Sequence, residues 1–284
     1  MDELPNVALT LTSLPENVSL VRATLSGIAD SVELDGSEQD DIRAAVTEAC
    51  NNVVLHAYPG ARGPLEVDVF LRRAALEVRV RDRGIGFPVQ VGEQTADSGG
   101  LGLPMMRALT RQLELCENPG AGTEARMEFA TPSARPLDVT PFDRRRLPLE
   151  AMSSAQTTTV AVTIAPAPLA RAVLPRVLST LAARAHFSTD RIADAQLLAD
   201  ALAAHAREAL GASPLSLAVE VEPRDLHVQI GPLGPRGTPH EPAASTLDGL
   251  APTIESLADA HRVMSIGHHE VLSLRLLDRR GEPR

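Results

Sequence analysis

The chain has 284 residues, a formal net charge of −10 at pH 7, 44% hydrophobic residues and 23% charged residues. This hydrophobic content suffices for one large or two ordinary domains and excludes a chain that is disordered throughout. The acidic balance argues against direct binding of nucleic acid, which requires a basic surface. An aromatic content of 2% without tryptophan excludes a stacking platform for single-stranded bases. The sequence contains no lysine, so a lysine-based phosphate loop is excluded as well.

Targeting signals and cysteine usage indicate in which cellular compartment the protein is expected. No apolar stretch approaches the ~18 residues of a membrane-spanning helix. The first ten residues lack the basic and apolar regions of a signal peptide. Cys50 and Cys116 lie within apolar-patterned segments, which is typical of reduced thiols. We therefore expect a cytoplasmic protein that does not associate with a membrane.

Helices are predicted early in the chain and again near residue 103. Apolar residues spaced alternately by three and four predict an amphipathic helix over 18–32. A second helix is predicted from about Ser37, with Asp40 placed for a capping box, to about His56. A third is predicted over 103–113, after a glycine-rich stretch.

Strands are predicted as two hairpins. Alternating apolar residues indicate strands at 65–71 and 76–80, joined through residues 73–75. A last hairpin is predicted to pair 113–116 with 125–129.

The second half of the chain repeats the pattern of the first. Residues 42–84 align without a gap on 192–234, so the helix and the two alternating runs recur 150 positions later. We predict two tandem domains, 1–131 and 157–280, joined by a linker at 132–156 that is rich in proline, arginine and serine. The alternative is chance agreement between two hairpins.

A polar stripe on the second helix is the first candidate for a functional site. Glu48, Asn52 and His56 are spaced by four residues, which places them on one helix face. An amide oxygen suits Mg²⁺, which prefers oxygen ligands, and a carboxylate can accept a proton from an attacking hydroxyl. The alternative is an ordinary solvated helix face.

The segment Asp82-Arg83-Gly84-Ile85-Gly86 follows the second predicted strand directly. Its carboxylate can accept a hydrogen bond from a purine amino group, and its glycines permit a close approach of backbone to ligand. An ordinary Asp-Gly turn is the alternative.

A second glycine-rich segment, Gly99-Gly100-Leu101-Gly102-Leu103-Pro104, opens the third helix. Free backbone N–H groups at a helix start can bind phosphate oxygens. The preceding residues 88–100 are small and polar and could close over the phosphates as a lid. The alternative is a flexible loop without a ligand.

In this order and spacing, the three segments resemble the GHKL ATPase superfamily, most closely the anti-sigma-factor serine protein kinases of bacteria. The resemblance covers about residues 8–131. The N box corresponds to 48–58, and the two glycine boxes correspond to 82–87 and 100–106.

The resemblance implies an α+β fold, the two-layer α/β sandwich of histidine kinase-like (Bergerat) ATPases, with ATP and Mg²⁺ as cofactors. It implies that Asn52 coordinates Mg²⁺, that Asp82 reads the adenine amino group, and that Glu48 is the catalytic base that activates a serine of an antagonist protein. The residues implied to line the nucleotide are Gly84, Gly86, Gly100, Leu101 and Gly102.

The implied partners are a sigma factor and an anti-sigma-factor antagonist of the STAS type, with a homodimer or an intrachain pseudo-dimer as the assembly.

The sequence departs from the family pattern at one place: residues 95–98 lack the arginine that such kinases place before the second glycine box. The alternative function is therefore a nucleotide-binding switch without phosphoryl transfer. The catalytic part of a histidine kinase is disfavoured, because no helical hairpin with a phospho-accepting histidine precedes residue 8.

The second copy lacks the candidate site residues. By the same offset, Glu48 falls on Leu198, Asn52 on Leu202 and Asp82 on Pro232. We expect a degenerate domain without nucleotide chemistry.

Overall fold

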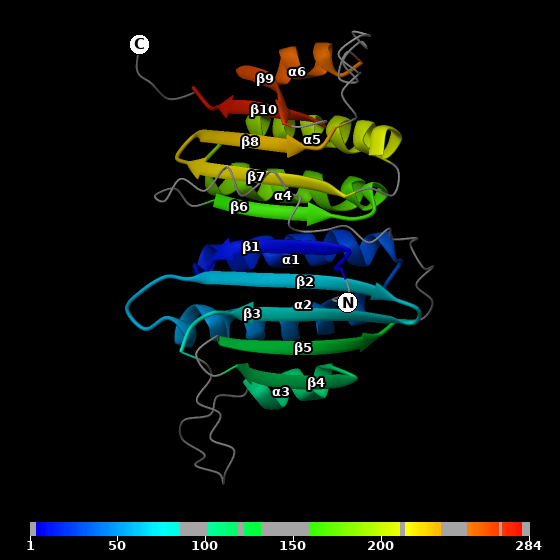
Figure 1. Ribbon diagram of the computed structural model, residues 1–284, viewed down its shortest axis with the longest axis vertical. Helices are drawn as coiled ribbons and strands as arrows, with labels where there is room; N and C mark the ends of the chain where they lie inside the picture. The colour runs from blue at the N-terminus through cyan, green and yellow to red at the C-terminus, as the bar shows by residue number, and fades with distance from the viewer. Residues whose placement is uncertain are drawn as a thin grey trace. The chain divides into compact units, whose positions relative to one another are not determined.

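The computed structural model describes residues 4–85, 102–118, 122–131, 159–210, 214–233, 249–266 and 269–279. The chain divides into two compact units, which among these residues comprise 5–131 and 159–279. In each unit five strands form a sheet with helices on one face (Figure 1). The predicted α+β fold class is confirmed. No helix within these ranges is both long and apolar enough to cross a bilayer.

The first unit contains five strands, three α-helices and a short π-helix. In chain order these are β1 (Val7–Thr12), α1 (Pro15–Ser31), α2 (Gly36–Asn52), η1 (Val53–Ala57), β2 (Pro64–Arg72), β3 (Ala75–Asp82), α3 (Gly102–Leu109), β4 (Gln112–Asn118) and β5 (Gly122–Ala130). The strands lie in the order β4-β5-β3-β2-β1 and pair antiparallel. The strand β1 was not predicted from the sequence; it pairs with β2, with Leu9 opposite Val67.

The second unit follows the same succession of strands and α-helices. Its elements are β6 (Thr159–Ile164), η4 (Ala167–Leu169), α4 (Ala170–Arg184), α5 (Thr189–Leu210), β7 (Leu215–Glu222), β8 (Asp225–Gly231), α6 (Ala251–Leu257), β9 (Ala260–Ile266) and β10 (His269–Leu277). The strands lie in the order β6-β7-β8-β10-β9. The predicted linker at 132–156 lies outside the described residues.

The core of the first unit lies between the sheet and its helices. Alternating residues of β2 and β3 are buried against the helices, and the largest fully buried side chains of α1, β2 and β3 are Leu20, Ile28, Leu65 and Leu76. The other buried aliphatic side chains of α1, α2 and the two strands include Val21, Leu25, Ile42, Val46, Val67, Val78 and Val80. Complete burial of one such aliphatic side chain contributes about 1.5–3 kcal/mol. A slip of one residue would turn charged side chains of the outer face into this core, so the register is strongly specified.

The start of α2 differs from the prediction. The capping box is formed by Asp35 and Glu38, not by Ser37 and Asp40. Asp35 has extended backbone and its Oδ1 accepts the N–H of Glu38 at 2.9 Å, while Glu38 Oε2 accepts the N–H of Asp35 at 2.9 Å. The helix therefore begins at Gly36, because Asp35 already satisfies a free N–H group of its first turn.

Two helix ends were also placed too late. The α-helical part of α2 ends at Asn52, and the next five residues form the π-helix Val53–Ala57. The third helix ends at Leu109 rather than Leu113, because β4 begins at Gln112 and pairs with β5. Sheet pairing thus overrides the apolar periodicity that extended the predicted helix.

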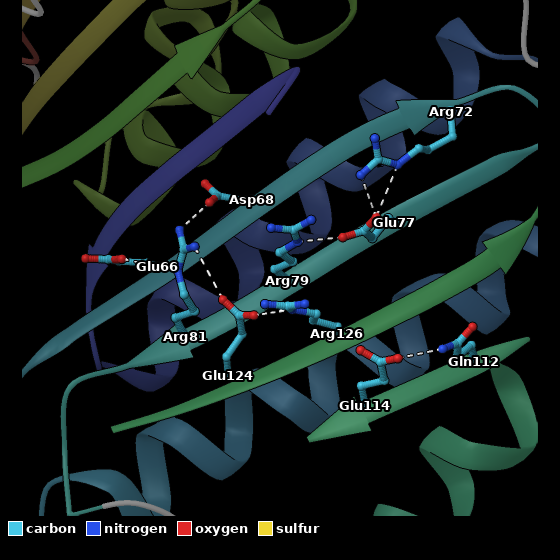
Figure 2. Close-up of polar contacts among 10 residues, drawn as sticks. All are labelled: Glu66, Asp68, Arg72, Glu77, Arg79, Arg81, Gln112, Glu114, Glu124 and Arg126. Atoms are coloured by element: carbon cyan, nitrogen blue, oxygen red, sulfur yellow. Dashed lines mark hydrogen bonds and ion pairs between the residues drawn. The ribbon is translucent and has the colours of Figure 1, made fainter. Parts of the chain in front are cut away.

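Charged side chains cover the outer face of the first sheet, opposite the helices (Figure 2). Arg81 on β3 pairs with Asp68 and also contacts Glu66 and Glu124, both at 3.5 Å. Asp68 is 2% exposed and Glu124 is 8% exposed. Arg81 therefore balances several carboxylates that are largely withdrawn from water.

A second group on the same face is centred on Glu77. Its carboxylate accepts hydrogen bonds from Arg72 at 2.7 Å and Arg79 at 2.5 Å (Figure 2). Burial opposes the shift, yet these two hydrogen bonds hold the pKa of Glu77 below its ordinary value. Both guanidinium groups also lie over the ring of Phe70, at 5.2 and 4.2 Å from its centroid.

Replacement of Arg81 by methionine tests the outer-face network. It leaves Asp68 and Glu124 without their shared cation, so we expect a loss of about 1–3 kcal/mol in the free energy of unfolding. Tyr58, the chain's single tyrosine, lies in the first unit, and its fluorescence during urea unfolding measures that unit. Arg111→Met is the control, because its exposed pair with Glu128 at 3.4 Å contributes about 0–1 kcal/mol. Equal losses in both variants would contradict the prediction.

Candidate functional site

Two polar side chains near the end of α2, Glu48 and Asn52, are candidates for contact with a ligand. Glu48 and Asn52 are half-buried. Neither side chain forms a hydrogen bond or ion pair within the described part of the chain. A Cβ on Gly102 would collide with Oε1 of Glu48, so the first residue of α3 lies directly beside this carboxylate. Two segments separated by about fifty residues in sequence thus meet at one point.

Cys50, which lies between Glu48 and Asn52 in the sequence, is buried. Complete burial raises the pKa of the Cys50 thiol to about 12, so the thiol stays protonated at neutral pH and acts as a packing group.

His56, the third residue of the predicted stripe, does not lie on the α-helix. It belongs to the π-helix Val53–Ala57 and is exposed. A π-helix has a different period from an α-helix, so the α-helical spacing that grouped His56 with Glu48 and Asn52 does not apply to it.

Asp82 is buried at the carboxyl end of β3 and is 5% exposed. Its Oδ1 accepts the N–H of Gly84 at 2.8 Å, and Thr123 at the start of β5 donates both its N–H and its hydroxyl. Burial raises the pKa of this carboxyl, and the three hydrogen bonds act in the opposite direction. The side chain is thus an oriented hydrogen-bond acceptor inside the protein.

Two glycines allow the close approach of segments around Asp82. A Cβ on Gly84 would collide with the carbonyl oxygen of Ala57 at the end of the π-helix. Gly122, with φ +89°, has no room for a Cβ beside the carbonyl oxygen of Asp82. The end of β3 is therefore enclosed by the π-helix and the start of β5.

Several predicted site residues cannot be placed. Gly86, Gly100 and Leu101 lie outside the described residues, as do the predicted lid at 88–100 and the segment 95–98. Of the predicted nucleotide-lining glycines, the structure places Gly84 and Gly102.

An open cavity of about 530 Å³ adjoins Glu48. It lies between the three helices of the first unit and is lined by side chains that include Arg22, Ser26, Arg43, Thr47, Glu48 and Met105. Arg43 pairs with Asp40, whereas Arg22 has no hydrogen-bond or ion-pair partner in the described ranges. The cavity lining therefore includes both the Arg22 guanidinium and the Glu48 carboxylate.

The sequence analysis did not identify Arg22, Gly122 or Thr123. Thr123 lies beside Asp82 because β3 pairs with β5, with Arg81 opposite Glu124. These strands are not consecutive in the chain, so no local pattern reveals the contact. The Gly-Thr pair after a predicted turn was the available signal.

The residues present fit a magnesium nucleotide. Asn52 offers an amide oxygen that has no partner among the described residues, a hard ligand suited to Mg²⁺. Gly102 allows the start of α3 to approach the Glu48 carboxylate, and Gly84 allows the segment after Asp82 to approach the π-helix. No cluster of three histidine, cysteine or acidic side chains suited to a metal occurs among the described residues. A metal held mainly by phosphate oxygens needs no such cluster.

The corresponding positions of the second unit are apolar. Leu198 and Leu202 on α5 are fully buried, and Leu233 next to Pro232 is fully buried as well. These side chains provide no acceptor for an amino group and no ligand for a cation. The unit therefore lacks the polar groups found at the end of α2 and β3.

Comparison with known proteins identifies the family of the first unit. Residues 11–129 match the model of the histidine kinase-like ATPase domain. Serine-protein kinase RsbW of Bacillus pumilus is 33% identical over 129 residues, covering 40% of this chain and 80% of the relative. RsbW of Listeria innocua is 35% identical over 127 residues, covering 40% and 81%. The chain belongs to the family of the RsbW serine-protein kinases. The family match lies within the first unit, and the described part of the second unit lies beyond it.

The raised pKa of Asp82 predicts how this family member responds to Asp82→Asn. A carboxyl with a higher pKa in the folded protein than in the unfolded chain destabilises the fold once pH exceeds its folded-state pKa. We expect the variant to have a higher Tm than the parent at pH 7. The difference should shrink as pH falls through the folded-state pKa of Asp82.

Tyrosine fluorescence during heating measures this effect in the first unit. Asp41→Asn, at an exposed position of α2, is the control for the loss of one surface carboxylate. A lower Tm of Asp82→Asn at pH 7 would contradict the assignment of a destabilising charge.

Proposed function

We propose that the first unit binds ATP with Mg²⁺ and transfers the γ-phosphoryl group to a serine of an anti-sigma-factor antagonist. The observation that carries the proposal is the meeting of Glu48 with the start of α3 at Gly102, one helical turn from the amide of Asn52, which has no partner in the described ranges. A base, a ligand for the cation and a helix start suited to phosphate are thereby gathered at one place. Membership of a family of serine-protein kinases supports the same activity.

Each side chain has a defined role in this proposal. ATP supplies the phosphoryl group, and Mg²⁺ offsets the charge of the phosphates. Asn52 would hold the cation, and Asp82 would accept a hydrogen bond from the adenine amino group. Glu48 would take the proton of the serine hydroxyl as its oxygen bonds to the γ-phosphorus and the bond to the ADP oxygen breaks.

The cavity beside Glu48 would receive the serine-bearing segment of the antagonist. It is open to solvent and is bounded by side chains of all three helices. Arg22 would contact carbonyl or carboxylate oxygens of the segment, because its guanidinium is unpaired in the described ranges.

The regulatory consequence concerns a sigma factor in the cytoplasm. The protein would hold the sigma factor, and an unphosphorylated antagonist would release it. Phosphorylation of the antagonist by the first unit would reverse that release.

The second unit would be a degenerate copy of the first. The central hairpins share one register, because the pair Val67 and Val80 recurs as Leu217 and Ile230, shifted by 150 positions. The turns of these hairpins are also alike: Ala74 and its counterpart Arg224 both have φ +61°. We infer that the copy keeps the fold for partner binding or for an intrachain pseudo-dimer.

One observation favours a second candidate function. Residues 95–98 contain no arginine to stabilise the transferring phosphoryl group. A switch that binds ATP and a partner without phosphoryl transfer would need no such cation.

Substitution of Glu48 by alanine separates the two functions. With labelled ATP, Mg²⁺ and a candidate antagonist, we expect label transfer to fall by about 10²–10⁴-fold, because the general base is removed. Nucleotide affinity, measured by calorimetry, should stay within about twofold. Asp41→Ala, exposed on the same helix, is the control and should transfer label like the parent. Binding of ATP by the parent without transfer to any antagonist would favour the switch.

Replacement of Arg22 by alanine tests the cavity. Loss of a charged hydrogen bond of about 1.5 kcal/mol corresponds to roughly a tenfold rise in KM for the antagonist. The affinity for ATP should not change, because Arg22 belongs to the proposed protein-binding side of Glu48. An unchanged KM, or an equal loss of ATP affinity, would place antagonist binding elsewhere.

A further inference from the structure

Tyr58 links the end of the π-helix to the segment that follows β3. It comes directly after Ala57, and its side chain is half-buried. Its hydroxyl donates to the carbonyl oxygen of Pro64 at 2.7 Å and accepts the backbone N–H of Arg83 at 2.7 Å. Residues 58, 64 and 83, which are distant in sequence, are therefore joined by one oxygen atom.

The position of this hydroxyl is fixed by packing of the ring. A Cβ on Gly63 would collide with the Tyr58 ring, so backbone and ring are in close contact on that side. The N–H of Gly63 is itself held by the hydroxyl of Ser13 at 3.1 Å. The loop that supports Tyr58 is thus anchored independently of residues 82–85.

Three successive residues after Asp82 are held by Tyr58 and its neighbour Ala57. Arg83 donates its N–H to the Tyr58 hydroxyl, Gly84 packs against the Ala57 carbonyl, and Ile85 donates its N–H to that carbonyl at 3.0 Å. Gly84 in turn donates its N–H to Oδ1 of Asp82. The direction of the Asp82 carboxylate therefore depends on a backbone segment that Tyr58 holds in place.

We propose that Tyr58 is a positioning residue that orients Asp82 toward the amino group of adenine. This inference rests on the proposed function, because it presumes that Asp82 reads the base. Tyr58 itself does not contact the nucleotide in this arrangement. It acts by fixing the N–H of Arg83 and, through Gly84, the orientation of the acceptor oxygen that remains for the ligand.

The protonation state of Tyr58 agrees with this role. Burial raises the pKa of its hydroxyl, the N–H of Arg83 opposes that shift, and the nearby Asp82 and Glu66 carboxylates add to it. The hydroxyl therefore stays protonated at neutral pH, as it must to donate to Pro64 while accepting from Arg83.

The test compares the affinities for ATP and for purine riboside triphosphate, which lacks the 6-amino group. The parent protein should prefer ATP about tenfold or more, because a buried carboxylate accepts a bond that only ATP supplies. Tyr58→Phe keeps the ring and removes the hydroxyl. We expect this preference to fall several-fold while the affinity for the analogue stays within about twofold. Circular dichroism confirms that the variant is folded.

Ser31→Ala is the matched control, because it removes a side-chain hydrogen bond to the Ile28 carbonyl at the end of α1, in the same unit, without affecting the loop that supports Tyr58. It should keep the parent preference. Gly63→Ala is a second variant that keeps the hydroxyl but displaces the ring, and it should lose the preference like Tyr58→Phe. In an Asp82→Asn background, Tyr58→Phe should cause no further change in the preference.

The outcomes distinguish this inference from the proposed function. If the parent and Asp82→Asn bind both nucleotides alike, or bind neither, the proposed reading of adenine by Asp82 is wrong. If Asp82→Asn abolishes the preference but Tyr58→Phe keeps it, the positioning role alone is overturned. Equal losses of affinity for both nucleotides in Tyr58→Phe would show a purely structural role and would overturn it as well.

Discussion

The carboxylate of Asp82 lies buried at the end of β3, and the surrounding segments are arranged around that charge. Burial disfavours the ionised form of this carboxyl group, and the hydrogen bonds from Gly84 and Thr123 offset part of that cost. These donors come from the segment after β3 and from the start of β5, and glycines at 84 and 122 allow both to approach. The cost of holding this acceptor inside the protein is consistent with selection for ligand binding rather than for stability.

The two units differ in whether the residues near the end of the second helix are polar or apolar. In the first, polar groups at the end of α2 remain unpaired in the described ranges and adjoin a cavity. In the second, Leu198 and Leu202 occupy the corresponding positions and are fully buried. Apolar packing at these positions stabilises a fold, whereas unpaired polar groups leave it open to a ligand. The two central hairpins nevertheless pair in the same register, with Val67 opposite Val80 in the first unit and Leu217 opposite Ile230 in the second.

The outer face of the first sheet is organised by ion pairs between its own side chains. Its charges are balanced within the face itself, with Arg81 shared among carboxylates of three different residues. Such a network holds β2, β3 and β5 together by cross-strand pairs. The proposed site residues Glu48, Asn52 and Asp82 lie on α2 and at the end of β3 and are not part of this network.

The sequence alone determined the periodic elements, the order of the motifs and the candidate residues Glu48, Asn52 and Asp82, because these depend on local spacing. The sequence did not predict the features that depend on contacts between segments distant in the chain. The strand β1, the shortened α3 and the position of Thr123 follow from strand pairing, and the π-helix Val53–Ala57, which contains His56, replaces the α-helical period on which the prediction relied. Tertiary structure alone placed Tyr58 against Arg83 and Glu48 against Gly102, since such contacts arise from chain packing and leave no periodic trace in the sequence.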